Sequence, residues 1–569
     1  MIECSRQPAG RAATVIRPFR TYHMQPLAQP LDDLEPHYDA VVVGSGYGGG
    51  VAASRLARCG QSVCVLERGK EFLTGDFPDR FPDIRRELHL SKKTGSIGTR
   101  DALFHVNIGR HIHVLTGCGL GGGSLINAAV AMRPDARVFL DPAWPDAIAG
   151  DKALDEGFSR AERMLRPTVC PDVRALTKYQ ALDRASAALA ARPHAAPIAV
   201  NFTATDTPSD GGQPACTLCG DCCTGCNVGA KNTIALTYLP DARAHGAAMF
   251  TGVDVSHIER ADDTWRIWFA SASANPKNKA AANRSVTARL VVLAAGTLGS
   301  TGILLRSREQ GLSLSDRLGH GFSTNGDIIA FGYGADEPVN AIGVGHPAKV
   351  DVDPVGPTVA GQIRLADGDR LENEMYVQEG AMPSGLAPLL PMAFIPGGRL
   401  LGAAQSLIKG VYKGPFANLH TFFVVSHDDA CGQIVLRNGS VDIDWPEIAE
   451  QDVYARVDDI LEQIVQANGA RYVKNPLAAI IGSKPATAHP LGGCGMGDDA
   501  GSGVVNHKGQ VFDTRRDATA DVHDGLYVCD GAVMPRSLGV NPLYTITGLA
   551  ERAMIHLARD RKWRFDDQS

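Results

Sequence analysis

The sequence lacks any long uninterrupted apolar run. Nowhere among its 569 residues is there a stretch of the roughly 18 consecutive apolar residues that a membrane-spanning helix requires. Residues 1–36 are rich in Arg, Pro and Gln, and they lack the apolar core of a secretory signal. We therefore expect residues 1–37 to form a flexible extension of a cytoplasmic protein, which contacts membranes peripherally at most and without stable insertion.

An excess of positive charge is also missing. The chain has 56 Lys and Arg residues against 62 Asp and Glu residues, which gives a formal net charge of −6. Without a basic field, nucleic acid is not expected as a partner. Hydrophobic residues make up 44% and charged residues 21% of the chain, a composition typical of soluble globular proteins. The length allows several domains.

The 13 cysteines lack the regular rhythm of a disulfide framework. Four of those between residues 216 and 226 follow the spacing C-x2-C-x2-C-x3-C, which bacterial ferredoxins use for cluster ligands. These candidate metal ligands are Cys216, Cys219, Cys222 and Cys226. Asn227 stands where ferredoxins have proline, and Cys223 is a bystander. Three interpretations stay open: an iron–sulfur cluster such as 4Fe-4S, a zinc site, or thiols without a metal.

Short β-branched runs predict a parallel sheet. They lie at residues 38–43, 62–66, 290–295 and 525–528. A helix predicted over residues 49–59 completes a βαβ unit with the first two strands. Strands of one sheet thus lie near both ends of the chain. We therefore expect an α/β fold with a discontinuous Rossmann-like domain, built from residues 38–330, which include the cysteine-rich insertion, and residues 486–569.

Residues 331–485 show a different pattern. Short alternating stretches predict antiparallel strands at Met375–Gln378, His420–Ser426, Gln433–Arg437 and Ser440–Asp444. An amphipathic helix is predicted over Gln451–Ala467. We expect these residues to form an antiparallel sheet with helices, inserted into the nucleotide domain and carrying the substrate site.

A glycine-rich turn follows the first strand and opens the first helix. Gly44, Gly46 and Gly49 allow a tight turn and a close approach of the backbone to a pyrophosphate, whose charge the helix N-terminus favours. Glu67 ends the second strand, where an acidic side chain binds a ribose hydroxyl. The combination predicts a dinucleotide site.

A second glycine-rich loop spans residues 117–127 and is followed by Arg133-Pro134. Its sequence, Gly-Cys-Gly-Leu-Gly-Gly-Gly-Ser-Leu-Ile-Asn, resembles the first signature of the glucose–methanol–choline (GMC) oxidoreductase superfamily. In that family the loop covers the pyrophosphate and the flavin ring of FAD, so the resemblance implies FAD as the cofactor. The contacts that it implies are Gly121, Gly122, Ser124 and Asn127.

The C-terminal part carries the residues expected to act on a substrate. The segment Thr-Ala-His-Pro-Leu-Gly-Gly-Cys at 487–494 and the Asn-Pro pair that begins at Asn541 resemble the segments that hold the catalytic pair of cholesterol oxidases. Histidine is the usual general base near neutral pH. The resemblance implies that His489 accepts the proton of a substrate hydroxyl and that Asn541 orients its oxygen. Further FAD contacts that it implies are Val255, Asp530 and Gly531.

The same resemblance implies a catalytic carboxylate near residues 376–386. Alignment without a gap places it at Gln378, and a shift by one residue places it at Glu379. Neighbours on a strand point to opposite faces, so this shift separates an active-site acid from none. Glu379 is the candidate carboxylate.

Together these features predict FAD-dependent oxidation of a bulky, sterol-like secondary alcohol to a ketone, with the hydride passing to flavin N5 and O2 as an acceptor. The cysteine segment favours an alternative, a dehydrogenase of non-steroid alcohols that passes electrons through an iron–sulfur cluster to a redox protein or quinone. A third alternative is a flavin- or metal-containing redox sensor without turnover, against which His489 and Asn541 argue.

Overall fold

The computed structural model describes most of the chain. The described residues are 25–92, 95–204, 212–273, 284–366, 368, 370–390, 410–474, 484–515 and 520–565. Residues 1–24 of the expected extension lie outside them. Residues 25–36 are held against the body, because the backbone N–H groups of Leu27 and Ala28 donate to the Glu71 carboxylate at 2.7 and 3.0 Å.

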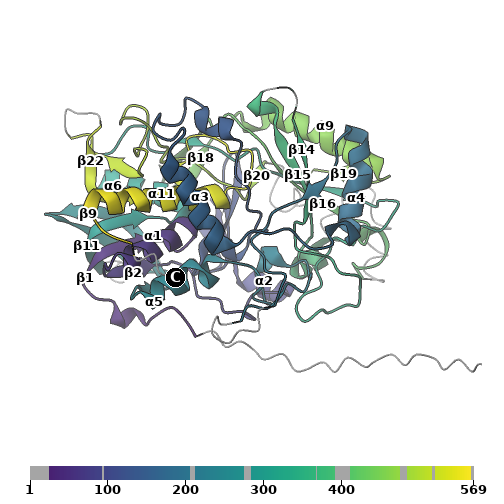
Figure 1. Ribbon diagram of the computed structural model, residues 1–569, viewed down its shortest axis with the longest axis horizontal. Coiled ribbons are helices and arrows are strands. Elements are labelled where there is room, and N and C mark those ends of the chain that lie inside the picture. The colour runs from purple at the N-terminus through teal and green to yellow at the C-terminus, as the bar shows by residue number, and fades with distance from the viewer. Residues whose placement is uncertain are drawn as a thin grey trace, which may run out of the picture.

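The first sheet gathers strands from distant parts of the chain (Figure 1). Its order is β21-β22-β11-β1-β2-β8, with the β9–β10 hairpin joined to β11. The bounds are β1 His37–Val43, β2 Val63–Leu66, β8 Ala248–Phe250, β9 Val253–Ala261, β10 Thr264–Ser271, β11 Arg284–Leu293, β21 Gln510–Phe512 and β22 Val522–Val528. The strands β22, β11, β1, β2 and β8 run parallel. This confirms the expected α/β fold with a nucleotide domain built from discontinuous segments.

Helices from both ends of the chain pack beside this sheet. They are α1 Tyr47–Arg58, α3 Lys152–Leu165, α5 Tyr238–Ala244, α6 Gly296–Glu309 and α11 Leu543–Arg561. The C-terminal helix α11, yellow in Figure 1, contacts both α1 and α3. Apolar strand residues such as Val41 and Val42 are fully buried, as is typical of a parallel sheet covered on both faces.

An antiparallel sheet with helices forms the other half of the molecule. Its order is β19-β13-β16-β15-β14-β7, which confirms the inserted sheet expected from the sequence. The bounds are β7 His194–Ala195, β13 Ile328–Tyr333, β14 Gly361–Leu365, β15 Met375–Gly380, β16 His420–Val425, β19 Arg471–Val473, α4 Thr177–Ser186 and α9 Asp452–Ala467. Residues 177–195 add α4 and β7 to this half, although they precede the expected boundary at residue 331.

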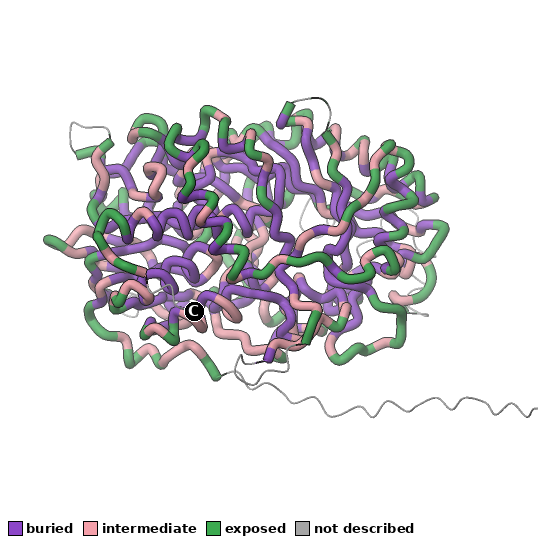
Figure 2. Tube along the Cα trace, in the orientation of Figure 1, coloured by how far each residue is buried: buried purple, intermediate pink, exposed green. Residues whose placement is uncertain are grey.

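Two smaller sheets complete the described fold. One is β12-β17-β18, which packs against α6, and the other is β20-β6-β5-β3-β4. The bounds are α2 Phe81–Arg86, β3 Leu88–Lys92, β4 Gly95–Ile97, β5 Phe104–Ile108, β6 His113–Gly117, β12 His320–Phe322, β17 Gly432–Arg437, β18 Ser440–Asp444 and β20 Ala486–Thr487. Figure 2 shows buried chain running through both halves. None of the described helices is long and apolar enough to span a membrane.

A buried ion pair ties the C-terminal helix to the first helix. The Arg55 guanidinium donates to both carboxylate oxygens of Glu551 at 2.7 to 3.1 Å. Tyr238 Oη donates to Glu551 Oε1 at 2.7 Å. Glu551 is 0% exposed, so its charge depends on these partners, which join α1, α5 and α11.

Replacing Glu551 by alanine would leave the Arg55 charge buried without its partner. We expect Glu551→Ala to lower the free energy of unfolding by about 3–5 kcal/mol. Arg559→Ala on the same helix is the control, because its pair with Glu156 has side chains that are 60% and 40% exposed, and such pairs contribute about 0–1 kcal/mol. Urea unfolding of the purified protein measures both. Equal losses in the two variants would contradict the role of the buried pair.

Candidate active site

The first glycine turn combines tight packing with one open position. Gly44 has φ +93°, and a Cβ at Gly49 would lie 2.0 Å from the Gly44 carbonyl oxygen. At Gly46, by contrast, a Cβ would meet only the Cα of Gly122, at 3.9 Å. Gly46 is the N-cap of α1, and no side chain caps that helix end. The start of α1 therefore offers both open space and backbone N–H donors that no side chain caps. This combination suits a phosphate group.

Glu67 follows β2 and faces the glycine turn. Its Oε2 accepts from the Ser45 amide at 3.1 Å and from the Ser45 hydroxyl at 2.6 Å. Its Oε1 accepts from the Gly69 amide at 2.8 Å. A carboxylate oxygen can accept two hydrogen bonds, so Oε1 can also accept one from a ribose hydroxyl. Glu67 thus fixes the turn and is able to bind a sugar beside it.

The second glycine-rich loop lies against the first. Gly122 has φ +57°, and a Cβ there would lie 2.7 Å from the Cα of Gly46. Ser124 Oγ donates to the Gly121 carbonyl at 2.6 Å. Asn127 Nδ2 donates at 2.7 Å to the tyrosine hydroxyl at the start of α1. The four predicted contacts of this loop therefore belong to one cradle with the first turn.

Asp530 and Gly531 lie where β22 ends. Asp530 Oδ1 accepts from the Ala532 amide at 2.9 Å, and its Oδ2 accepts from Ser300 Oγ, on α6, at 2.5 Å. Burial raises the pKa of the Asp530 carboxyl to about 6. Val255 is a buried residue of β9. FAD contact at Val255, Asp530 and Gly531 stays a prediction.

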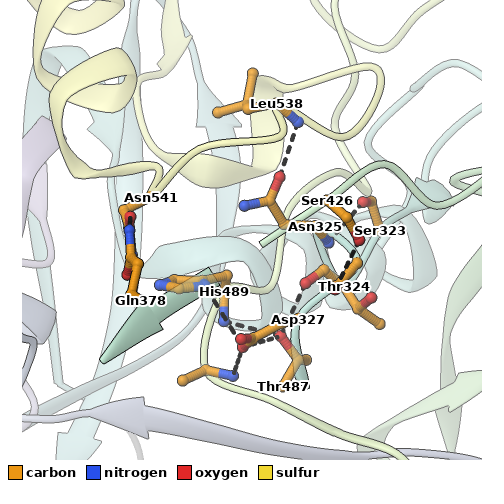
Figure 3. A network of polar contacts seen from close by, with 12 residues as sticks. Ser323, Thr324, Asn325, Asp327, Gln378, Ser426, Thr487, His489, Leu538 and Asn541 are labelled. Atoms are coloured by element: carbon orange, nitrogen blue, oxygen red, sulfur yellow. Dashed lines mark hydrogen bonds and ion pairs between the residues drawn. The ribbon is translucent and has the colours of Figure 1, made fainter. Parts of the chain in front are cut away.

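His489 follows β20, which pairs with β6, the strand that leads into the second loop. The Nδ1 atom of His489 lies 3.4 Å from Asp327 Oδ2, as Figure 3 shows. The same oxygen accepts from the Ala488 amide at 2.7 Å. Asp327 therefore holds the backbone before His489, and its carboxylate lies beside Nδ1, which makes no hydrogen bond among the described residues. Nε2 is the nitrogen left to face a substrate.

Asn541 faces Gln378, which comes from β15 of the inserted sheet. Gln378 Nε2 donates to Asn541 Oδ1 at 2.6 Å, and Asn541 Nδ2 donates to Gln378 Oε1 at 3.3 Å. Gln378 is 0% and Asn541 7% exposed. In Figure 3 the His489 imidazole points toward this amide pair. His489 and Asn541 thus lie on two separate loops, and in Figure 3 both face Gln378.

Glu379, the predicted catalytic carboxylate, points away from this group and binds Lys178 instead. Its Oε2 accepts from Lys178 Nζ at 2.6 Å, and its Oε1 accepts from the Gly361 amide at 2.8 Å. Both charged side chains are 0% exposed. Because successive strand residues point to opposite faces, the register that directs Gln378 toward Asn541 directs Glu379 away from it.

Residues 323–327, the clamp segment, connect to both the loop that carries His489 and the loop that carries Asn541. Asn325 Oδ1 accepts from the Leu538 amide at 2.8 Å, and Asn325 Nδ2 donates to the Val540 carbonyl at 2.8 Å. Asp327 holds the other loop, before His489. Reasoning from sequence missed this role. The Thr-Asn-Gly-Asp composition of the segment indicates a turn, but it does not indicate what the turn holds.

Two family models match the sequence. The N-terminal model for GMC oxidoreductases matches residues 38–323, and the C-terminal model matches residues 449–550. The chain belongs to the GMC oxidoreductase family.

Several named proteins resemble this GMC oxidoreductase over most of its length. A cholesterol oxidase of Acinetobacter baumannii is 27% identical, with 91% of this chain and 94% of that protein covered. A cholesterol oxidase of Mycobacterium tuberculosis is 29% identical, with 91% of each covered. A long-chain-alcohol oxidase of Arabidopsis thaliana is 24% identical, with 90% of this chain and 66% of that protein covered.

A solved structure supports the GMC fold. Pyridoxine 4-oxidase from "Mesorbium loti" matches with a TM-score of 0.56 at 16% identity, covering 92% of this chain and 99% of that chain. FAD is the cofactor of the GMC family, and the residues present fit it. The open position at Gly46 and the uncapped start of α1 suit its pyrophosphate, and the Glu67 carboxylate suits its ribose.

The predicted ligand cysteines of this GMC chain line one cavity. The cavity is small and partly open to solvent. All four predicted ligands line it: Cys216, Cys219, Cys222 and Cys226. Cys223 is not part of the lining. Within the described part of the chain, no three or more His, Cys, Asp or Glu side chains form a group that could hold a metal ion.

Lys231 connects this cavity to the second glycine-rich loop. It lines the cavity, and its Nζ donates to the carbonyl oxygens of Leu125 at 2.8 Å, Asn127 at 3.0 Å and Cys222 at 2.8 Å. Lys231 is 1% exposed, and burial lowers its pKa. The cysteine cavity and the second glycine-rich loop thus share one buried side chain.

A side chain at the open glycine should displace FAD without disturbing the fold. We expect Gly46→Val to lose FAD, because the fold leaves room for a Cβ that would then occupy the space for the pyrophosphate. Gly501→Ala, in an exposed turn, is the control. The ratio of flavin to protein absorbance after gel filtration measures occupancy, and circular dichroism checks the fold. Full FAD occupancy in Gly46→Val would refute the assignment.

Proposed function

We propose that this GMC oxidoreductase uses FAD to oxidise a bulky, sterol-like secondary alcohol to a ketone. The observation that carries the proposal is that His489, with the Asp327 carboxylate beside its Nδ1, points toward the amide pair of Asn541 and Gln378. The names of the relatives, two cholesterol oxidases and a long-chain-alcohol oxidase, support an alcohol as substrate and O2 as electron acceptor.

Each side chain has a separate role toward the substrate hydroxyl group. When bound, FAD supplies the ring that accepts a hydride from the carbinol carbon. His489 Nε2 takes the hydroxyl proton, since Nδ1 faces Asp327, whose carboxylate stabilises the imidazolium that results. Both amide atoms of Asn541 bind Gln378, but Nδ2 keeps a second N–H and Oδ1 a second lone pair. Asn541 orients the hydroxyl oxygen through one of these remaining groups.

Apolar side chains continue the sheet face that holds Gln378. Phe423 lies directly opposite Gln378 in β16, and Ile329 lies directly opposite Phe423 in β13. Directly opposed side chains share a face. Ile329 is 36% exposed, although β13 is an interior strand. An apolar surface beside the amide pair supports a bulky apolar substrate.

Loss of the base should slow the chemistry but leave the cofactor in place. We expect His489→Ala to lower the rate constant of flavin reduction by at least ~10²-fold with FAD retained. Asn541→Ala should act similarly through loss of orientation. Anaerobic stopped-flow reduction by a sterol and by a long-chain primary alcohol measures both effects and separates the substrate classes. His37→Ala, at an exposed residue of β1, is the control. Near-normal reduction in either active-site variant would mean that the pair is structural.

The cysteine cavity supports a second candidate, a dehydrogenase that passes electrons to a redox protein or quinone. A single zinc ion requires its four thiolate ligands to converge on one point. In a four-iron cluster each thiolate binds a different iron, so the thiolates can lie further apart. Lys231 supports this candidate as well. Its described hydrogen-bond partners are neutral carbonyl oxygens, so nearby negatively charged thiolates would stabilise its buried positive charge. Its bonds to the second loop support a site close to the flavin.

Metal analysis distinguishes the three interpretations of the cysteines. On this candidate, anaerobically purified protein should contain about four irons per chain with acid-labile sulfide. Cys219→Ser should then lose turnover with an artificial acceptor but keep flavin reduction by substrate. Cys223→Ser is the matched control from the same segment. Zinc in place of iron would indicate a structural metal site. The absence of both metals would contradict the dehydrogenase candidate and favour the oxidase.

A redox sensor without turnover remains the third candidate. A flavin that neither a sterol nor a long-chain alcohol reduces would favour it over both enzymes. The cytoplasmic location expected from the sequence stays a prediction.

A further inference from the structure

A single row of side chains crosses five strands of the inserted sheet beside Asn541. Each member lies directly opposite the next, from β13 through β16, β15 and β14 to β7. In this order the row is Ile329, Phe423, Gln378, Gln362 and His194. Directly opposed residues point to the same face, so the row has an apolar half and a polar half. Gln378, where the polar half begins, is the residue that binds Asn541.

Hydrogen bonds run along the polar half in one direction. Gln378 Nε2 donates to Gln362 Oε1 at 3.1 Å, and Gln362 Nε2 lies 3.2 Å from His194 Nε2. The Gln362 oxygen already accepts from Gln378, so its nitrogen is the donor toward His194. His194 Nε2 must therefore be the acceptor, which requires a neutral ring protonated at Nδ1. Burial and the Arg364 guanidinium lower the pKa of His194 and favour this neutral ring.

Burial makes each amide depend on the next one. Gln378 is 0% and Gln362 1% exposed, so a rotated Gln378 amide would place its oxygen against the oxygens of Gln362 and Asn541 without water between them. The reciprocal pair of Asn541 and Gln378 is by itself compatible with two orientations, since an amide presents a donor and an acceptor of nearly equal shape. The second link, to Gln362, restricts this freedom, because Gln378 and Gln362 must then keep matching orientations. His194 extends the row as an acceptor when its ring is protonated at Nδ1.

We propose that Gln362 and His194 are positioning residues that decide which amide atom of Asn541 faces the substrate hydroxyl. They act through Gln378 and touch neither substrate nor cofactor. Breaking the row lets the Asn541 amide populate the reversed orientation, in which donor and acceptor exchange places. The inference rests on the proposed function, in which Asn541 orients the hydroxyl.

The test is a double-mutant cycle on flavin reduction in the FAD-containing enzyme. We expect Gln362→Leu, which removes both links, to lower the rate constant of reduction about 5- to 10-fold with little change in the dissociation constant of the alcohol. Gln362→Glu retains an acceptor for Gln378 and should keep most of the rate. His194→Phe, which removes the terminal acceptor, should lower the rate in the same sense as Gln362→Leu.

The decisive measurement is Gln362→Leu in the Asn541→Ala background. If Gln362 acts through Asn541, it has no further effect there. A loss that multiplies with that of Asn541→Ala, or an equal loss in Gln362→Glu and Gln362→Leu, would overturn the inference and indicate a structural role. A normal rate in Gln362→Leu beside a slow Asn541→Ala would overturn the inference alone. A normal rate in Asn541→Ala itself would overturn the proposed function.

Discussion

The pairing of β22 with β11 is the interaction on which the rest of the site depends. It returns the C-terminal segment to the sheet that begins at β1. The approach is close, because a Cβ at Gly48 of α1 would lie 1.5 Å from the Cys529 carbonyl oxygen. Only glycine admits this contact. Asn541 follows β22, so this ladder fixes the origin of its loop, whereas His489 follows β20, which pairs with β6.

Buried polar contacts, more than apolar packing, then set the two loops against each other. Asp428 Oδ1 accepts from Ser323 Oγ at 2.6 Å, and its Oδ2 accepts from the Thr324 amide at 2.6 Å. Burial raises the pKa of Asp428, and these hydrogen bonds oppose the rise. The clamp segment that Asp428 holds reaches one loop through Asn325 and the other through Asp327. A buried network of this kind has few alternative arrangements that satisfy every member.

The alternation of side chains along β15 decides which group lies next to Asn541. On β15 the amide of Gln378 faces the catalytic loops, and the carboxylate of Glu379 faces Lys178 on α4. A shift of one residue would exchange a neutral amide for a buried charge and leave Lys178 without its partner. Either change carries a large desolvation cost, so the ion pair on one face stabilises the amide row on the other.

The sequence by itself determined the features that depend on neighbours along the chain. Gly44, Gly46 and Glu67 follow from a strand, a turn and a helix N-terminus within one βαβ unit, and the four cysteines that line one cavity follow from their spacing. His489 and Asn541 could be named because the segment around each resembles one that holds the catalytic pair of cholesterol oxidases.

Only the tertiary structure decided what these residues meet. The clamp segment, the pairing of Gln378 with Asn541 and the entry of α4 and β7 into the inserted sheet join residues more than a hundred positions apart. Short-range patterns carry no information about such contacts. The choice between Gln378 and Glu379 depends on strand register, which cross-strand pairing sets and local sequence does not.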